Sequence, residues 1–353
     1  MNVTTARPME LGIYSFGELT DNPRAGQARD AHERIGQLLD HARIADQGGL
    51  DIFALGEHHR HDFAVSAPEV VLAAIATATS RIRLASGVTV LSSQDPVRVF
   101  QQFATLDQVS DGRAEIWAGR GAFTESFPLF GYQLNDYDEL FEEKLELLLR
   151  LREEPTITWS GNRRPAISAG EISPRPVQDP LPVWIAIGGT PASAVRAGLL
   201  GLPMMMMGFF AGPEQFVPRV ELYHRAAARA GHDPSSLRLG VSGHMYVGKT
   251  SQGARDDFFP HYARYFEEAG RRLGSGGFPR SVYDSWIEAS LPVGSPQQVI
   301  EAILTRVELL GIDRFIGQFD VGNLPREMSR ESLELYLTEV APVIRRETAG
   351  VAA

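Results

Sequence analysis

The sequence lacks cysteine: none of its 353 residues carries a thiol. This absence excludes disulfide bonds, thiolate nucleophiles, iron–sulfur clusters and cysteine-ligated zinc. Long apolar runs are also missing, because the most apolar stretch, 199–210, is broken by Gly201 and Pro203. That stretch is shorter than the roughly 20 residues that span a bilayer, and the polar segment 1–8 has no apolar core of a secretion signal. We therefore expect a cytoplasmic protein without a membrane segment.

Positive charge is scarce: 34 lysines and arginines face 44 aspartates and glutamates, which gives a formal net charge of −10. A nucleic acid or an anionic membrane requires a clustered basic face on the protein, so we expect neither as a partner. A small anionic ligand is still compatible with this charge, since one arginine at a site outweighs a diffuse surface charge. With 43% apolar and 22% charged residues, the composition is that of a soluble globular enzyme.

Strand-like and helix-like segments alternate along the whole chain. Gly48 and Gly49 end the first helical pattern, whereas Asp95 and Pro96 form a suitable beginning for the third. The expected strands are Leu11 to Phe16, Asp51 to Leu55, Ile82 to Leu91, Ala114 to Ala118, Val183 to Ile187, Pro203 to Met207, Leu237 to Val247 and Asp313 to Phe319. The expected helices are Ala31 to Gln47, Pro68 to Thr79, Asp95 to Ser110, Asp136 to Arg152, Ala192 to Leu200, Glu214 to Ala230, Pro296 to Leu310 and Arg330 to Arg346.

Eight strand–helix units in series favour a (β/α)₈ TIM barrel. An open doubly wound sheet has the same alternation, but its phosphate-binding glycine spacing is absent after the first strand, which continues as Phe16-Gly17-Glu18. We interpret residues 1–353 as a single barrel domain with insertions at about 155–182 and 250–292. We expect both insertions to supply lid and substrate contacts. Aromatic residues in the second insertion either line an apolar pocket or pack under a long loop; they are Phe258, Phe259, Tyr262, Tyr265, Phe266, Tyr283 and Trp286.

The chemistry of a barrel lies at the carboxyl ends of its strands, and the second strand is followed there by Glu57-His58-His59-Arg60-His61. A solvated polar loop is one interpretation of this segment. Metal binding through His59 and His61, as in a barrel hydrolase, is another. The fifth and sixth strands end in glycine and methionine, and His244 and Asp320 alone do not complete a metal site. We therefore expect no metal.

Two further strand ends together suggest a phosphate site. After the fourth strand, Arg120 stands between Gly119 and Gly121, where its guanidinium can reach an anion with little hindrance. After the fifth strand, the turn 188–193 begins a helix, whose free backbone N–H groups suit an anion. The residues in question are Gly188, Gly189, Thr190 and Ser193. A surface ion pair of Arg120 and simple hydroxyl capping of the helix are the alternatives.

Two strand segments carry weaker signals. Gly87, within Ser86-Gly87-Val88-Thr89, marks a bulge or a close approach of the backbone to a ligand. The run Met204 to Met207 is best interpreted as packing, with alternate side chains pointing into and out of the barrel.

Taken in order from about residue 10 to 345, these segments resemble the bacterial luciferase-like monooxygenase family. The resemblance rests on Glu57-His58-His59, Ser86-Gly87-Val88, Asp95-Pro96-Val97-Arg98, Leu106 to Arg113, Gly119-Arg120-Gly121, Phe130-Gly131, Gly188-Gly189-Thr190, Gly201-Leu202-Pro203 and Val293-Gly294-Ser295-Pro296.

The resemblance implies an FMN-dependent barrel enzyme. Reduced FMN, supplied by a separate flavin reductase, would react with O₂ to give a flavin peroxide that oxygenates a small organic substrate. By position, His58 resembles the catalytic histidine, which we expect to handle a proton near neutral pH. Glu57 resembles a residue that lines the flavin pocket. The family further implies a homodimer formed through helices of the first half of the barrel.

The resemblance also assigns the cofactor contacts. The bond between Gly87 and Val88 falls where the family has a non-proline cis peptide facing the flavin ring. Arg120 matches the family's phosphate-binding arginine, and Gly188, Gly189, Thr190 and Ser193 fall in the turn that holds the same phosphate.

One departure from the luciferases leaves alternatives open. Where luciferase carries a carboxylate and a serine in the phosphate turn, this sequence has Gly189 and Thr190, so we expect no light emission, and riboflavin is a possible substitute for FMN. A deazaflavin-dependent hydride-transfer enzyme and a flavin-binding protein without catalysis are the rival interpretations.

Overall fold

The structure is a computed structural model that describes residues 7–19, 30–121, 123–208, 212–273, 277–322 and 324–349. Eight parallel strands close into a barrel in the order β1-β12-β9-β8-β7-β4-β3-β2. The predicted (β/α)₈ barrel is thus confirmed, and each expected strand contributes to it. The barrel strands are β1 (Glu10–Ser15), β2 (Ile52–Leu55), β3 (Arg83–Val90), β4 (Ala114–Gly119), β7 (Val183–Ile187), β8 (Met204–Met207), β9 (Leu239–His244) and β12 (Arg314–Gln318).

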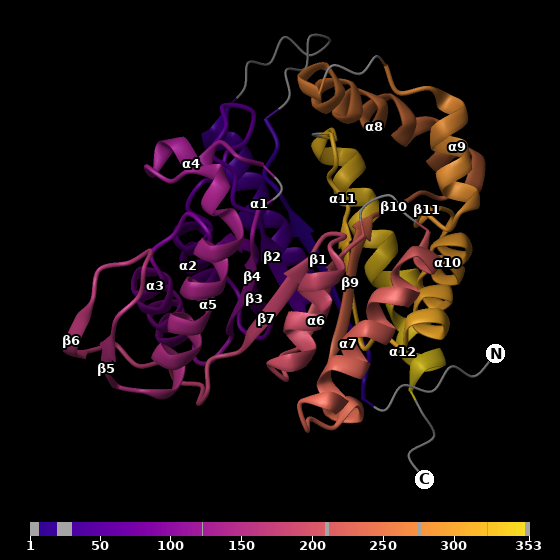
Figure 1. Cartoon of the computed structure of the whole chain (residues 1–353). Coiled ribbons are helices and arrows are strands. Elements are labelled where there is room, and N and C mark those ends of the chain that lie inside the picture. Colours follow the sequence, from indigo (N-terminus) through magenta and orange to yellow (C-terminus); the bar gives the residue numbers. More distant parts are fainter. Residues whose placement is uncertain are drawn as a thin grey trace.

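Helices surround the barrel (Figure 1). Their beginnings are fixed locally: the Asp30 side chain accepts hydrogen bonds from the first turn of α1, and Asp95 caps α3 in the same way. The last expected helix is in fact two helices joined by a π-helical turn over Tyr336–Val340. The helices are α1 (Ala31–Gln47), α2 (Pro68–Ala78), α3 (Pro96–Ser110), α4 (Ser126–Leu129), α5 (Tyr137–Glu153), α6 (Pro191–Leu199), α7 (Val217–Arg229), α10 (Pro296–Leu310), α11 (Arg326–Leu335) and α12 (Ala341–Thr348).

The barrel interior is a packed core. Met205 belongs to an inner cluster with Tyr14, Trp117 and Trp184, whereas its neighbours Met204 and Met206 pack in the shell between the barrel and the helices. The predicted alternation of the methionine run is therefore confirmed. Met205 fills the interior with its flexible side chain while the flanking methionines help to attach the helices.

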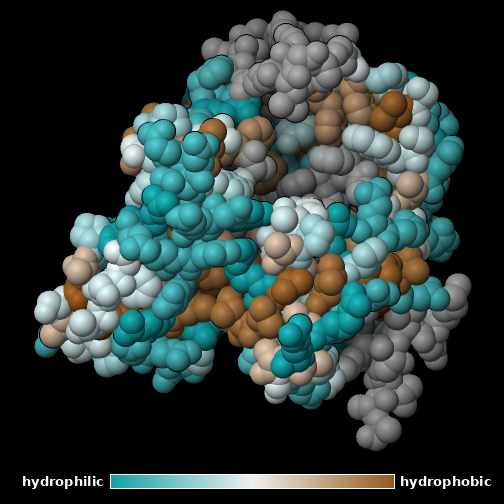
Figure 2. All heavy atoms as spheres, in the orientation of Figure 1, coloured by the Kyte–Doolittle hydropathy of each residue, from teal (hydrophilic) through white to brown (hydrophobic). Residues whose placement is uncertain are grey.

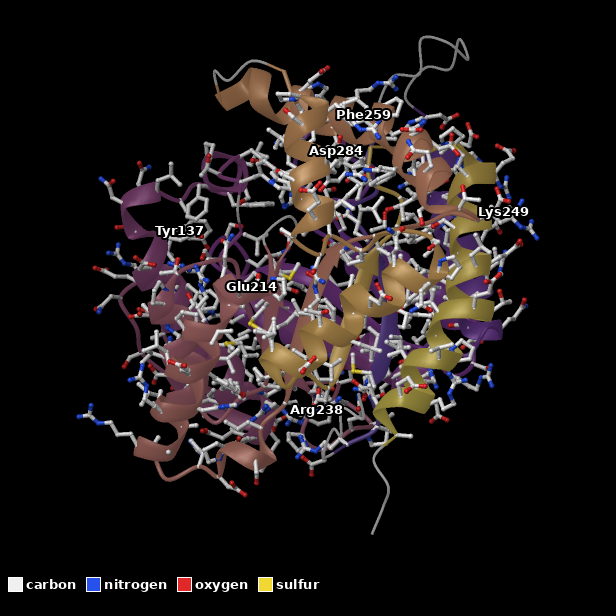
Figure 3. All side chains as sticks on the ribbon, turned by 90° about the vertical axis from the view of Figure 1, so that its right-hand side faces the viewer. Tyr137, Glu214, Arg238, Lys249, Phe259 and Asp284 are labelled. Atoms are coloured by element: carbon white, nitrogen blue, oxygen red, sulfur yellow. The ribbon has the colours of Figure 1, made fainter. Side chains whose placement is uncertain are left out.

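Charged residues close the amino-terminal end of the barrel. Arg314 and Glu115, whose side chains are each 1% exposed, form an ion pair of 2.5 Å. Arg238 extends this network to Glu10, with an N–O distance of 2.7 Å. Figure 3 places Arg238 at the lower side of the molecule, opposite Phe259 and Asp284 at the top.

The insertion at 155–182 contains an antiparallel hairpin, β5 (Thr156–Trp159) and β6 (Ile167–Glu171). It packs on the outside of the helix ring, because Gln101 and Gln108 of α3 donate hydrogen bonds to backbone carbonyls of the insertion. The expectation that this insertion forms part of a lid is wrong, since these contacts hold it on outer helices.

The insertion at 250–292 forms two helices, α8 (Ser251–Leu273) and α9 (Arg280–Glu288), which lie above the barrel in Figure 1. A short parallel pair, β10 (Tyr246–Val247) and β11 (Val293–Gly294), joins the two ends of the insertion. Phe258, Tyr262 and Tyr283 are fully buried against one another in a separate aromatic cluster. The packing interpretation of these three aromatics is therefore correct.

A groove of about 770 Å³ runs between α5 and α6 on the outside of the barrel. Its apolar side chains include Leu149, Val195 and Leu199, and Figure 2 shows a hydrophobic strip between these helices. Among the described residues, no helix is both long and apolar enough to cross a bilayer.

Candidate active site

The candidate active site lies at the carboxyl ends of the barrel strands. The segments that follow β4 and β10 lead there into α4 and α8, and Figure 2 shows a hollow in the surface between these two regions. Side chains from β1, β2, β3, β4, β7, β9 and β12, and from the loops after them, surround this end of the barrel. It is the end at which the sequence places its candidate residues.

His58, directly after β2, is enclosed by three phenylalanines. Its imidazole stacks on Phe63 at a centroid distance of 4.1 Å and meets the edges of Phe16 at 4.6 Å and Phe123 at 5.2 Å. The side-chain Nε2 atom is buried and has no hydrogen-bond partner among the described residues. A buried polar atom of this kind is costly unless a ligand satisfies it. The aromatic enclosure therefore fixes the ring and leaves one nitrogen available for a bound molecule.

Burial controls the charge of His58. Removal from water, followed by the nearby charges of Arg60 and His59, lowers the pKa of the imidazole to about 3. The ring is therefore neutral at physiological pH. The expectation that His58 handles a proton near neutral pH stays a prediction, and a neutral imidazole can donate or accept a hydrogen bond.

Glu57 is engaged within the protein through both carboxylate oxygens. Its Oε1 atom contacts His59 Nε2 at 2.7 Å and accepts a hydrogen bond from Gln94 Nε2 at 3.1 Å, while Oε2 accepts one from the backbone N–H of Val90 at 2.9 Å. The side chain is fully buried. Glu57 thus holds the end of β3 in place beside His58. In the part of the chain that the structure describes, no group of three or more His, Asp or Glu side chains lies close enough together to hold a metal ion.

The peptide bond between Gly87 and Val88 is cis, as the resemblance implies. The pairing of β3 with β4 shifts at this point, and Val88 is partly exposed beside the inner barrel cluster. A Cβ atom on Gly119 would lie 2.7 Å from Val88 Cγ2. The glycine before Arg120 is therefore required for the position of Val88 at the mouth of the barrel.

The structure brings Arg120 and Thr190 together, as the sequence predicted. Arg120 Nη2 donates a hydrogen bond of 2.8 Å to Thr190 Oγ1, while Nη1 contacts Asp138 Oδ1 at 2.5 Å. The guanidinium also lies over the ring of Tyr137, at 5.0 Å from its centroid. Figure 3 shows Tyr137 on the opposite side of the molecule from α11 and α12. Arg120 is thus oriented by three neighbours at the rim.

The turn after β7 presents its backbone to solvent. Gly188, Gly189 and Thr190 are exposed, and a Cβ atom on Gly188 would meet nothing within 4 Å. Thr190 occupies the cap position of α6 but its hydroxyl makes no capping hydrogen bond, which removes the alternative of simple capping. Ser193 lies in the first helical turn and is largely buried. The guanidinium, the hydroxyl and the helix N-terminus together fit a phosphate group.

Sequence reasoning missed two residues of this rim. Asp138 lies in the first turn of α5, and Arg219 of α7 donates a hydrogen bond of 2.9 Å to the carbonyl of Gly189. Neither follows a barrel strand directly, so their approach depends on how α5 and α7 pack. Among the described residues, Arg219 has no carboxylate partner and contacts only carbonyl groups and the Phe216 ring.

A second polar group of residues lies at the ends of β1 and β12, across the barrel from β7 and β4. Asp320 accepts hydrogen bonds from Ser15 at 2.7 Å and Arg34 at 2.6 Å. Glu18 accepts one from Gln318 at 2.9 Å. Burial and the neighbouring Asp320 raise the pKa of the Glu18 carboxyl group.

Comparison with known proteins agrees with the barrel fold. A sequence profile described as luciferase-like monooxygenase matches residues 9–314. The chain resembles the monooxygenase RslO1 from Streptomyces bottropensis, with 26% identity, a TM-score of 0.83 and coverage of 95% of this chain and 99% of the other.

Two further solved structures share the fold. One is the oxygenating constituent of 3,6-diketocamphane monooxygenase from Pseudomonas putida in complex with FMN, with 21% identity, a TM-score of 0.79 and coverage of 96% and 99%. The other is an F420-dependent secondary alcohol dehydrogenase with an F420-acetone adduct, with 19% identity, a TM-score of 0.72 and coverage of 96% and 99%.

Proposed function

Because this chain belongs to the luciferase-like monooxygenase family, we propose that it is a monooxygenase that uses reduced FMN and O₂ to oxygenate a small organic substrate. A separate flavin reductase would supply the reduced FMN in the cytoplasm. The observation that carries this proposal is the placement of two features at one end of the barrel. One is the Arg120–Thr190 pair at the rim, and the other is His58, whose Nε2 atom has no hydrogen-bond partner in the described part of the chain.

In this proposal the rim holds the phosphate of FMN. Arg120 supplies the charge, Thr190 supplies a hydroxyl, and the backbone of the turn at Gly188 and Gly189 leaves room for close approach. Arg219 adds a second cation within reach of the same turn. Riboflavin lacks the phosphate, so these contacts would favour FMN.

His58 and Val88 would contact the flavin ring or the substrate beside it. The phenylalanine enclosure holds the His58 imidazole neutral and excludes water around it. A neutral imidazole donates or accepts a hydrogen bond at Nε2 and can pass on a proton without storing one. The bound reduced flavin would supply the electrons that activate O₂.

We further propose a homodimer through the helices of the first half of the barrel. Val70 on α2 is 67% exposed and Val109 on α3 is 48% exposed, which supplies apolar surface for such an interface. Sedimentation equilibrium would test this part of the proposal: a monomer at micromolar concentration would contradict it.

Rapid mixing with oxygen tests the function. Protein loaded anaerobically with reduced FMN is mixed with air-saturated buffer while flavin absorbance and oxygen uptake are followed. We expect oxidised FMN to appear more slowly than from free reduced FMN, because the enclosed site would shield the bound flavin from water. Kinetics identical to those of free reduced FMN would contradict the proposal.

A deazaflavin-dependent hydride-transfer enzyme is the second candidate, since a solved structure with the same fold is F420-dependent. Its signature would be preference for a reduced deazaflavin without oxygen uptake. Parallel measurement with both cofactors therefore separates the two functions.

A further inference from the structure

Asp138 contacts the guanidinium that the proposed function assigns to the phosphate, and nothing in the proposed reaction requires this contact. Its Oδ1 atom accepts a hydrogen bond of 2.5 Å from Arg120 Nη1. The Arg120 side chain is 19% exposed and that of Asp138 is 68% exposed, so the carboxylate approaches the guanidinium from the solvent side. A phosphate at the rim would approach the same nitrogen from the same side.

We propose that Asp138 competes with the cofactor phosphate for Arg120 and so sets the affinity for FMN relative to riboflavin and the rate at which FMN leaves. This inference rests on the proposed function. It concerns a residue outside the barrel strands, contributed by the beginning of α5.

The charges around the turn support competition rather than simple orientation. A phosphate monoester carries about −1.5 to −2 charges at neutral pH, so it is repelled by a carboxylate that shares its guanidinium. Arg219 is a second cation described at this turn, and it contacts carbonyl groups. A carboxylate of α5 thus neutralises Arg120, whereas Arg219 has no carboxylate partner among the described residues.

Exposure makes the competition reversible. An exposed ion pair contributes little to stability, so Asp138 can rotate away when a dianion arrives. The pair therefore reduces the affinity for phosphate without closing the site. Such a device suits a cofactor that must enter reduced and leave oxidised in every turnover.

The chain offers a matched control. Glu139 lies in the same first turn of α5 and is 69% exposed, but it pairs with Arg163 and not with Arg120. Asp138→Asn and Glu139→Gln each remove one negative charge from this helix end. The difference between these two variants isolates the contact with Arg120 from the general charge of the helix.

Anaerobic titration with reduced FMN and reduced riboflavin tests the proposal. We expect Asp138→Asn to increase the affinity for reduced FMN by about three- to tenfold at low salt. The increase should be smaller at high salt, and the affinity for reduced riboflavin should not change. Dissociation of FMN should slow by a similar factor. Glu139→Gln should change the FMN affinity less than twofold. An unchanged ratio of FMN to riboflavin affinity in Asp138→Asn would overturn the proposal. Weaker FMN binding in that variant would overturn it too, because it would show that Asp138 orients Arg120 for the phosphate.

Inorganic phosphate gives a readout that does not depend on flavin binding. The arginine side-chain NMR signals of labelled protein are followed, and the Arg120 signal is assigned by its loss in Arg120→Lys. Asp138→Asn should lower the Kd for phosphate at this signal, and an unchanged Kd would overturn the competition. If Asp138→Asn lowers the Kd for phosphate at Arg120 while no reduced flavin binds, the proposed function fails and the competition for phosphate stands. If flavin binds but Asp138→Asn matches the wild type, the competition fails and the function stands.

Discussion

The Oε2 atom of Glu57 accepts a hydrogen bond of 2.9 Å from the backbone N–H of Val90. This bond joins the loop that carries His58 to the strand that carries Val88, so two parts of the candidate site depend on one buried carboxylate. Glu57 thus holds two parts of the site together, whereas the family resemblance would place this residue in the flavin pocket itself.

Replacement of Glu57 should therefore affect stability more than flavin binding. Glu57→Ala would leave the Val90 N–H and the Gln94 amide without their buried acceptor. We expect the free energy of unfolding to fall by about 2–4 kcal/mol, measured by urea denaturation. Glu171, exposed on β6, is the control, and its alanine variant should change stability by less than about 0.5 kcal/mol. Normal stability with a lost flavin affinity in Glu57→Gln would instead indicate direct contact with the flavin.

His58 should be required for oxygenation but not for flavin binding. We expect His58→Ala and His58→Asn to keep the Kd for reduced FMN within about threefold, because the proposed phosphate contacts come from Arg120 and Thr190 and not from His58. With a substrate that the wild type oxygenates, oxygen should be released as hydrogen peroxide and not transferred. His61→Ala, at an exposed position of the same loop, should retain coupling. Wild-type coupling in both His58 variants would exclude the proposed role.

Buried histidines should make the protein sensitive to mild acid. Burial lowers the pKa of His58 and His244 to about 3 and that of His41 to about 4. In the unfolded chain the histidine pKa is about 6.5, so below that pH the unfolded state binds more protons than the folded state. The free energy of unfolding should therefore fall as pH decreases from 6.5 toward 4, by up to about 1.4 kcal/mol per pH unit for each histidine.

The variant His41→Asn tests this account away from the site. In this variant, the slope of the unfolding free energy against pH should decrease between pH 6.5 and 4. The decrease should correspond to about one proton fewer taken up on unfolding. His32 is exposed on the same helix, and His32→Asn should leave the slope unchanged. Equal slopes in the wild type and His41→Asn would contradict the buried neutral state of His41.

The ion pair at the other end of the barrel predicts a stability effect without a functional one. Arg314 and Glu115 are each 1% exposed at the side chain, and Arg314 and Arg83 help to lower the pKa of Glu115 to about 2 despite its burial. Arg314→Ala should reduce the unfolding free energy by about 3–5 kcal/mol, because Glu115 loses its buried partner. Arg330→Ala breaks an exposed pair with Glu334 and should cost less than about 1 kcal/mol. Comparable losses of unfolding free energy in the two variants, measured by denaturation, would contradict the stabilising role of the buried Arg314–Glu115 pair.

The sequence could predict those features that follow from the barrel itself. Once the strands are known, residues after β4 and β7 must be neighbours, and Arg120 and Thr190 do form a hydrogen bond. The same reasoning places Glu57 and His58 beside the end of β3. Adjacent strand ends converge because a closed parallel barrel leaves them no other position.

Other features depend on packing that the sequence pattern does not reveal. The low pKa of His58 comes from burial, to which Phe63 and Phe123 contribute from separate segments. Asp138 reaches Arg120 only because α5 begins beside the rim. The second insertion is mostly helical, whereas the sequence pattern predicts no helix there. Its aromatic side chains pack against one another, and this packing stabilises helices that the local sequence pattern only weakly indicates.

Cofactor titration of an Arg120 variant tests the central claim most directly. Reduced FMN, reduced riboflavin and a reduced deazaflavin are titrated anaerobically into the wild type and into Arg120→Ala. We predict that, of the three cofactors, the wild type binds reduced FMN most tightly. Arg120→Ala should lower the affinity for reduced FMN by about ten- to hundredfold, because hydrogen bonds to a charged group are lost. Riboflavin affinity should stay within about twofold. Equal losses for FMN and riboflavin, or no flavin binding by the wild type, would contradict the account.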